Sequence, residues 1–193
     1  MAEQKAHRGL DANLLKLIAI AAMTADHIAW LLFPGYATGA LPVTLHIIGR
    51  ITCPIMCFFI AEGFHYTHDR KKYALRLLAL AVVSHFAYLF ASNSYVDWHS
   101  FIPFYYGDLL NQTGVVWSLL GGLLMLWLCE DEERGMGVKV AGVLLICLVT
   151  LPADWSCIAA LCVLSIGSNR GNPQKQIAWC LFYVAIYAVV YFF

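Results

Sequence analysis

The chain has 193 residues, of which 61% are hydrophobic and only 12% are charged, and its mean hydropathy is +0.71. This composition excludes a water-soluble domain of such a size and predicts an integral membrane protein. The formal net charge is +0, so we expect no nucleic-acid partner, because such binding needs a basic face.

Apolar runs long enough for membrane helices follow one another along the chain. A helix needs about 20 apolar residues to cross the hydrocarbon core. The runs are 14–33, 43–67, 73–91, 113–128, 138–151, 156–167 and 177–193. They predict an all-α, polytopic membrane helical bundle of about seven transmembrane segments, as a single integral membrane domain over 1–193. The short run 156–167 leaves a tilted, re-entrant or half-spanning segment as an alternative.

The basic residues lie in alternate loops. Lysine and arginine precede the first run and follow the second, fourth and sixth, whereas 34–42, 92–112 and 152–155 contain neither. The positive-inside rule therefore places the N-terminus and the basic loops in the cytoplasm and the C-terminus outside, in a multi-pass membrane protein. We expect no cleaved signal peptide, because Asp26 and His27 interrupt the first apolar run.

Asp26 and His27 lie side by side in the middle of that first run. An ionisable side chain at the centre of a membrane helix costs roughly 2.5 to 3.5 kcal/mol, so such residues usually face the protein interior and indicate a functional site. Helical geometry puts Lys16, Met23 and His27 on one stripe and turns Asp26 about 100° away. Asp26 either reaches a neighbouring helix or folds back to orient the His27 ring.

The second run carries Arg50 toward its outer half and Glu62 near its cytoplasmic end. Counted at about 1.5 Å per residue along antiparallel helices, Arg50 comes level with Asp26 and His27. The same count brings Glu62 level with Lys16. We therefore predict an outer polar layer of Asp26, His27 and Arg50, and an inner layer of Lys16 and Glu62.

A proline and several cysteines also mark the second run. Pro54 removes the N–H that would bond the Arg50 carbonyl, which predicts a kink beside the arginine. His46, Cys53 and Cys57 match none of the usual zinc spacings, so we expect no metal. The chain has 7 cysteines, six of them within apolar runs, and no disulfide framework is implied.

His85 and Asp154 are secondary candidates for the polar site. His85 lies in the third run at about the depth of the outer layer, and Asp154 follows the fifth run. A histidine hydrogen-bonded between helices is an equal alternative for His85. Solvent exposure, or an N-cap for a helix that starts at Trp155, is the alternative for Asp154.

Two connections carry further information. Arg70, Lys71, Lys72 and Arg76 form a basic run that is first a topology determinant and a binder of anionic lipid headgroups. Its second interpretation is a dock for a phosphorylated cofactor. The outer loop 92–112 is rich in tyrosine and tryptophan, which is typical of an aromatic belt or a lid.

Several of these segments resemble the TraX family, the membrane acetylases of conjugative pilin. The matching segments are Lys16 with AIAAMTADH, GRITCP with Phe58 and Phe59, EGFHYT, RKKYALRL and AYLFA. The similarity is strongest over residues 10–91. Beyond it, Asn111 to Gly122 and the Asp154/Trp155 turn fit the family pattern loosely.

The resemblance implies an enzyme that transfers an acetyl group from acetyl-CoA, its co-substrate, to the N-terminal amine of a pilin subunit in the inner membrane. The expected partners are thus acetyl-CoA, a pilin-like acceptor and the lipid bilayer. The chain is also similar, more distantly, to transmembrane acyltransferases that modify sugars through a membrane-embedded histidine. A sugar or polysaccharide hydroxyl is therefore the alternative acceptor.

Acyl transfer to an amine needs a base for the amine proton and a donor to the developing oxyanion. We predict His27 as general base, with Asp26 fixing its tautomer, and Arg50 as either oxyanion donor or counter-ion of Asp26. A nucleophilic His27 that forms acetyl-histidine stays open. The residues predicted to bind acetyl-CoA are Lys16, Glu62, Arg70, Lys71, Lys72 and Arg76.

Three other interpretations of the chain stay open. A buried Asp–Arg pair with a nearby histidine can lock two helices together without any chemistry. Intramembrane Asp, His, Arg and Glu also serve proton-coupled transporters of small solutes, although the chain shows no inverted repeat. A non-catalytic assembly factor for a pilus or secretion system needs no polar cluster at all.

Overall fold

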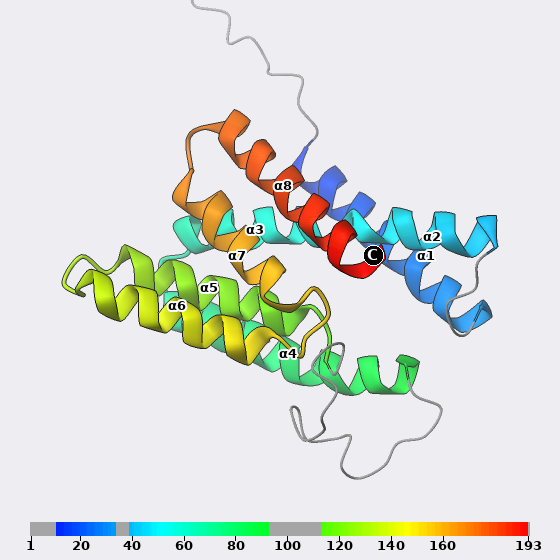
Figure 1. Ribbon diagram of the computed structural model, residues 1–193, viewed down its shortest axis with the longest axis horizontal. Coiled ribbons are helices and arrows are strands. Elements are labelled where there is room, and N and C mark those ends of the chain that lie inside the picture. Colours follow the sequence, from blue (N-terminus) through cyan, green and yellow to red (C-terminus); the bar gives the residue numbers. More distant parts are fainter. Residues whose placement is uncertain (1–10, 34–38, 93–112, 193) are drawn as a thin grey trace, which may run out of the picture. The chain divides into compact units, whose positions relative to one another are not determined.

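The computed structural model describes residues 11–33, 39–92 and 113–192, which contain eight helices (Figure 1). Their bounds are α1 Ala12–Leu32, α2 Ala40–Arg50, α3 Thr52–Tyr66, α4 Arg70–Ser92, α5 Val116–Glu130, α6 Met136–Thr150, α7 Ser156–Ser168 and α8 Pro173–Phe192. Each predicted apolar run coincides with one of these helices, or with α2 and α3 together. The predicted all-α membrane bundle is confirmed. Most of the aromatic loop 92–112 lies outside the described residues.

Three stretches are long and apolar enough to cross a membrane: Ala12–Leu32, Ala40–Tyr66 and Arg70–Phe90. The apolar helices α5, α6 and α7 are shorter, at 15, 15 and 13 residues. At about 1.5 Å per residue, α7 extends over about 20 Å, less than the hydrocarbon core. The count of seven spans therefore stays a prediction.

The second predicted run is interrupted at Ile51, between the end of α2 and the start of α3. Pro54 lies three residues further on and has no N–H to continue the helical hydrogen bonds back to Arg50. The proline predicted a kink at this place, and the structure divides the run at Ile51, which keeps right-handed helical angles with φ -65 and ψ -25.

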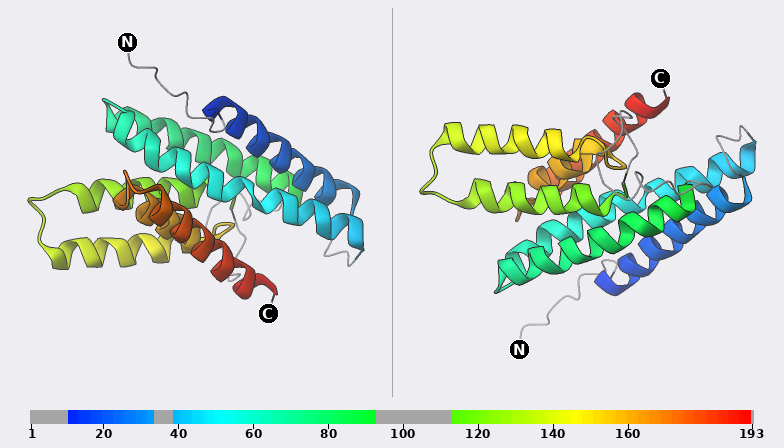
Figure 2. Two further views of the ribbon diagram at one scale, coloured as in Figure 1. Left: turned by 90° about the horizontal axis from the view of Figure 1, so that it is seen from above. Right: turned by 90° about the horizontal axis from the view of Figure 1, so that it is seen from below.

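The chain forms two compact units, Met1–Ile55 and Met56–Phe193. The single domain over 1–193 stays a prediction. In the first unit α1 packs against α2, and both views of Figure 2 show the two helices side by side. The buried residues at this contact are Ala19, Ala22 and Ala29 on α1, and Pro42, Gly49 and Cys53 on α2 and the start of α3. Small residues of this kind let two membrane helices approach closely.

In the second unit the contact between α5 and α7 is the most extensive, and α5 and α6 form a helical hairpin (Figure 2). Glycines make the close approach of α5 to its neighbours possible. A Cβ added to Gly122 would lie 2.5 Å from Cβ of Val163, and one added to Gly121 would lie 2.5 Å from Cγ2 of Thr150. α8 packs on α7, where the Tyr187 ring stacks on Trp155 with 3.8 Å between centroids.

Candidate functional site

Asp26 and His46 form the polar contact between α1 and α2. His46 Nδ1 lies 2.7 Å from Asp26 Oδ1, and the two side chains are 20% and 17% exposed. A carboxylate only accepts hydrogen bonds, so His46 Nδ1 carries the proton and Nε2 is the acceptor nitrogen of the neutral ring. This is the arrangement in which a carboxylate orients an imidazole for proton transfer.

A glycine on α2 makes this contact possible. A Cβ added to Gly49 would lie 2.3 Å from Asp26 Cβ and 2.6 Å from Asp26 Cγ. Any larger residue at position 49 would therefore displace the carboxylate. The Trp30 ring also contacts the imidazole, with 4.9 Å between the Trp30 and His46 centroids and a tilt of 56°.

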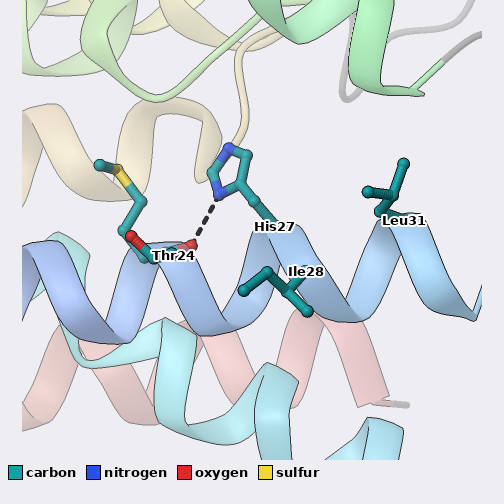
Figure 3. A pocket seen from close by; sticks show the side chains of 5 residues that line it. Thr24, His27, Ile28 and Leu31 are labelled. Carbon is teal, nitrogen blue, oxygen red and sulfur yellow. Dashed lines mark hydrogen bonds between the residues drawn. The ribbon is translucent and has the colours of Figure 1, made fainter.

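His27 extends from another side of α1. Its Nδ1 lies 2.8 Å from the Met23 carbonyl, which only accepts, so Nδ1 donates and Nε2 is the acceptor nitrogen. Figure 3 shows the ring directed away from the α1 backbone. His27 is exposed and lines a shallow pocket of about 280 Å³. The pocket is lined by Met23, Thr24, His27, Ile28 and Leu31.

These contacts decide the alternative that the sequence left open for Asp26. Asp26 reaches the neighbouring helix and bonds His46, so the expectation that it fixes the His27 tautomer is corrected. The Met23 carbonyl holds the His27 ring instead. Arg50 is half-buried on α2, directly after Gly49, and so lies at about the depth of Asp26.

His85 and Asp154, the two secondary candidates, both form hydrogen bonds with Thr113 in the second unit. His85 is buried, and its Nδ1 lies 3.0 Å from Thr113 Oγ1. The Asp154 backbone N–H donates to the Thr113 carbonyl at 2.8 Å, and Asp154 Oδ1 accepts from the Trp155 N–H at 3.0 Å. α7 begins at Ser156 after a left-handed Trp155 with φ 64, so Asp154 orders the turn and does not cap the helix.

Glu62 pairs with Arg170, in the turn between α7 and α8. The distance from Arg170 Nε to Glu62 Oε2 is 3.4 Å, and the guanidinium lies 4.8 Å from the Tyr66 ring centroid. The pair borders an open pocket of about 510 Å³ that His65 and Gly171 also line. Arg170 is thus a partner of Glu62 within the second unit, and the predicted pairing of Glu62 with Lys16 stays a prediction.

Arg70 makes an ion pair with Glu130, at the end of α5, and its guanidinium lies 4.3 Å from the Phe64 ring centroid. These contacts join α4 to α3 and α5. Arg70 therefore has a structural role in addition to the predicted contact with acetyl-CoA, and part of its charge is neutralised by the carboxylate.

The rest of the basic run lies on the surface of α4. Lys72 Nζ lies 3.2 Å from Asp69 Oδ2, and hydrogen bonds from the Lys72 backbone and side chain lower the pKa of Asp69. Lys71 and Arg76 are exposed, and the described residues include no ion pair for either. Their charges are thus available to an anionic ligand.

His46 is the site residue that the sequence analysis considered only as a metal ligand and then dismissed. Among the described residues, no group of three or more His, Cys, Asp or Glu can hold a metal ion. The sequence did contain a signal for the contact between His46 and Asp26. Asp26 lies on the same face of α1 as the buried Ala22 and Ala29. His46 lies on the same face of α2 as the buried Pro42 and Gly49. Two stripes of small residues that face each other predict that the polar residues within them meet.

The fold and the site define an all-helical membrane protein with a histidine–carboxylate pair between two apolar helices. The chain belongs to the TraX family, because the family described as TraX protein matches residues 11–193.

Two curated proteins are similar to this chain. A probable fimbrial assembly protein FimC, serogroup H1, of Dichelobacter nodosus is 29% identical over 175 residues, which are 88% of this chain and 67% of that protein. An uncharacterized protein of Rickettsia prowazekii (strain Madrid E) is 40% identical over 60 residues, which are 31% of this chain and 21% of that protein. No solved structure matches the chain.

Proposed function

We propose that this protein is a multi-pass inner-membrane acetyltransferase that moves the acetyl group of acetyl-CoA to the N-terminal amine of a pilin-like protein. The family supports this function, since the TraX resemblance implies pilin acetylation. The FimC relative is named for fimbrial assembly, which agrees with a pilin-like acceptor.

The observation that carries the proposal is the hydrogen bond of His27 to the Met23 carbonyl. It selects the tautomer in which Nε2 is the acceptor nitrogen, and Nε2 is the nitrogen that an approaching amine would meet. A general base needs an unprotonated nitrogen facing its substrate, and such a base contributes roughly a hundredfold to ten-thousandfold in rate.

In the reaction, the amine nitrogen attacks the thioester carbonyl carbon, and His27 Nε2 takes a proton from that nitrogen. The C–N bond forms, the C–S bond breaks, and the sulfur leaves as thiolate. Arg50, at the depth of Asp26, is the proposed donor to the oxyanion that develops on the carbonyl oxygen.

The basic residues near the start of α4 are the proposed contacts for the phosphates of acetyl-CoA. The exposed Lys71 and Arg76 fit this role best, because Arg70 and Lys72 already face carboxylates. Lys16 is exposed on α1, and Glu62 borders the 510 Å³ pocket. The basic loops are proposed to face the cytoplasm, where acetyl-CoA is available.

The test is acetyl transfer by purified protein in detergent, with radiolabelled acetyl-CoA and a pilin subunit whose N-terminal amine is free. We expect labelled pilin and released CoA, and we expect His27→Gln to lower the rate by about 100- to 10,000-fold. His68→Gln is the matched control, because His68 is exposed in the turn between α3 and α4. It should change the rate by no more than about twofold.

Wild-type protein that consumes no acetyl-CoA would overturn the proposal, and so would a His27→Gln variant with full turnover. Solute uptake into proteoliposomes without acetyl consumption would favour the transporter. If His27→Gln removed helicity or monodispersity instead of turnover, the histidine would have a structural role.

A further inference from the structure

The reaction proposed above does not use the hydrogen-bonded pair of Asp26 and His46. We propose that this pair, with Trp30, is the subsite that receives the positively charged amine of the acceptor and takes its first proton. The inference rests on the proposed acetyl transfer and adds a second catalytic imidazole to it.

Proton stoichiometry gives a second base a task. At neutral pH an N-terminal amine is largely an ammonium, since its pKa is about 7.7 to 8.0. Conversion of an ammonium to an amide removes two protons from the nitrogen, one before the attack and one during or after it. One imidazole holds only one of them, and His27 accounts for the second.

The geometry of His46 suits the first proton. Asp26 Oδ1 accepts from Nδ1 at 2.7 Å, so Nε2 is the nitrogen that accepts a proton from the substrate. The carboxylate then faces an imidazolium and stabilises it as an ion pair, as in other carboxylate–histidine pairs. The side chains of His46 and Asp26 are 20% and 17% exposed, so the pair is accessible without being open to bulk solvent.

The surroundings also suit a cation. The Asp26 carboxylate supplies the negative charge that attracts an ammonium, and the face of an indole attracts cations too. The Trp30 centroid lies 4.9 Å from that of His46, so one ligand can contact both rings. Arg50 lies one turn beyond His46 on the same face of α2, and its charge favours the neutral amine once the proton has moved.

The complete sequence balances. His46 Nε2 takes a proton from the ammonium. The resulting neutral amine then moves to His27, on another side of α1, and attacks the thioester carbon there. His27 Nε2 takes the second proton as the C–N bond forms and the C–S bond breaks. The CoA thiolate takes one proton back from an imidazolium, and the other proton passes to water. Each turnover thus yields acetylated amine, CoA thiol and one released proton.

The distinguishing experiment is the pH dependence of His46→Gln. The probe is a synthetic peptide with the N-terminal sequence of a pilin and a free α-amine, acetylated by full-length protein in detergent. Without His46 the enzyme depends on the neutral amine present in solution. Its rate should therefore rise about twentyfold from pH 6.5 to pH 9, which is the ratio of neutral amine at the two pH values. The wild-type rate should change much less.

Two comparisons make the result specific. His27→Gln should stay slow over the whole range, because the second proton still lacks an acceptor. A peptide whose α-amine is made less basic by fluorination should restore His46→Gln at pH 6.5, since that amine is already neutral. A merely structural role of His46 would not respond to the basicity of the acceptor.

The outcomes separate the two proposals. Wild-type protein without transfer at any pH would overturn the acetyltransferase function and this inference with it. An active wild type, with a His46→Gln variant that is unimpaired or impaired by one constant factor at every pH, would overturn only the inference. If His46→Gln does not fold, Asp26→Asn replaces it. The same rescue is expected, because the amide favours the other tautomer of His46.

Discussion

Two carboxylates of this protein have the same distance to a basic partner and very different surroundings. Asp26 Oδ1 lies 2.7 Å from His46 Nδ1, between two apolar helices, with side chains 17% and 20% exposed. Asp131 Oδ2 lies 2.7 Å from Arg134 Nε, in the turn between α5 and α6, with side chains 34% and 53% exposed.

The difference shows that a short distance between two charged or polar atoms does not by itself measure how much the pair contributes to stability or function. Water screens the Asp131–Arg134 pair, so an exposed pair of this kind contributes little to the free energy of unfolding. The Asp26–His46 pair lies in surroundings of lower polarity, where a hydrogen bond is stronger and the loss of one partner costs more free energy. The first pair orders a turn, whereas the second selects the tautomer of an imidazole.

The comparison is tested most strongly by the same substitution in both pairs. Asp26→Asn should lower acetyl transfer at pH 6.5 by up to about twentyfold, because an amide can donate to Nδ1 and favour the wrong His46 tautomer. Asp131→Asn should stay within about twofold of wild type. The measurement is the initial rate with radiolabelled acetyl-CoA. Equal rates for the two variants would remove the distinction between the pairs.

A substitution at Gly49 should also disrupt the Asp26–His46 pair. Gly49→Ala introduces a Cβ 2.3 Å from Asp26 Cβ, whereas a Cβ at Gly137 in α6 meets nothing within 4 Å. We expect Gly49→Ala to destabilise the protein by about 1 to 3 kcal/mol through overpacking. Gly137→Ala should be neutral or slightly stabilising, because alanine favours a helix.

Thermal unfolding in detergent, followed by circular dichroism, compares the two glycine variants. Their acetyl transfer rates are measured in the same preparations. A Gly49→Ala variant with the melting temperature and activity of Gly137→Ala would show that Asp26 does not need this close contact.

The exposed charges of α4 should affect binding more than chemistry. Lys71→Gln and Arg76→Gln should each raise KM for acetyl-CoA by up to about fivefold and leave kcat unchanged, with a smaller effect at high salt. Lys175→Gln, at an exposed position near the start of α8, is the control and should leave KM unchanged. An equal rise in KM for all three would indicate general charge attraction and no particular site.

The smallest expected effect is the pH dependence of the exposed pair. The side-chain hydrogen bond from Arg134 lowers the pKa of Asp131 below its usual value near 3.8. The pair therefore adds stability above that usual value, and the contribution is lost as pH falls through the lower pKa of the folded state. The difference in melting temperature between wild type and Asp131→Asn should be small at pH 6 and vanish toward pH 3. A difference that grows on acidification would contradict this assignment.

The sequence by itself determined the class of protein, the positions of the helices and the interruption beside Arg50. These features are local. The hydropathy of a run sets where a helix forms in apolar surroundings. The missing N–H of Pro54 removes a helical hydrogen bond near Arg50 wherever the rest of the chain lies. The family also followed from short segments of sequence, and residues 11–193 match it.

Only the tertiary structure decided which polar residues are partners. Asp26 bonds His46 and not His27, Glu62 bonds Arg170, and both His85 and the Asp154 backbone bond Thr113. Depth counted along a run has an error of about one turn and carries no information on the rotation of a neighbouring helix. Rotation is set by close packing of small residues such as Gly49, and the side chains within that contact become partners for this reason.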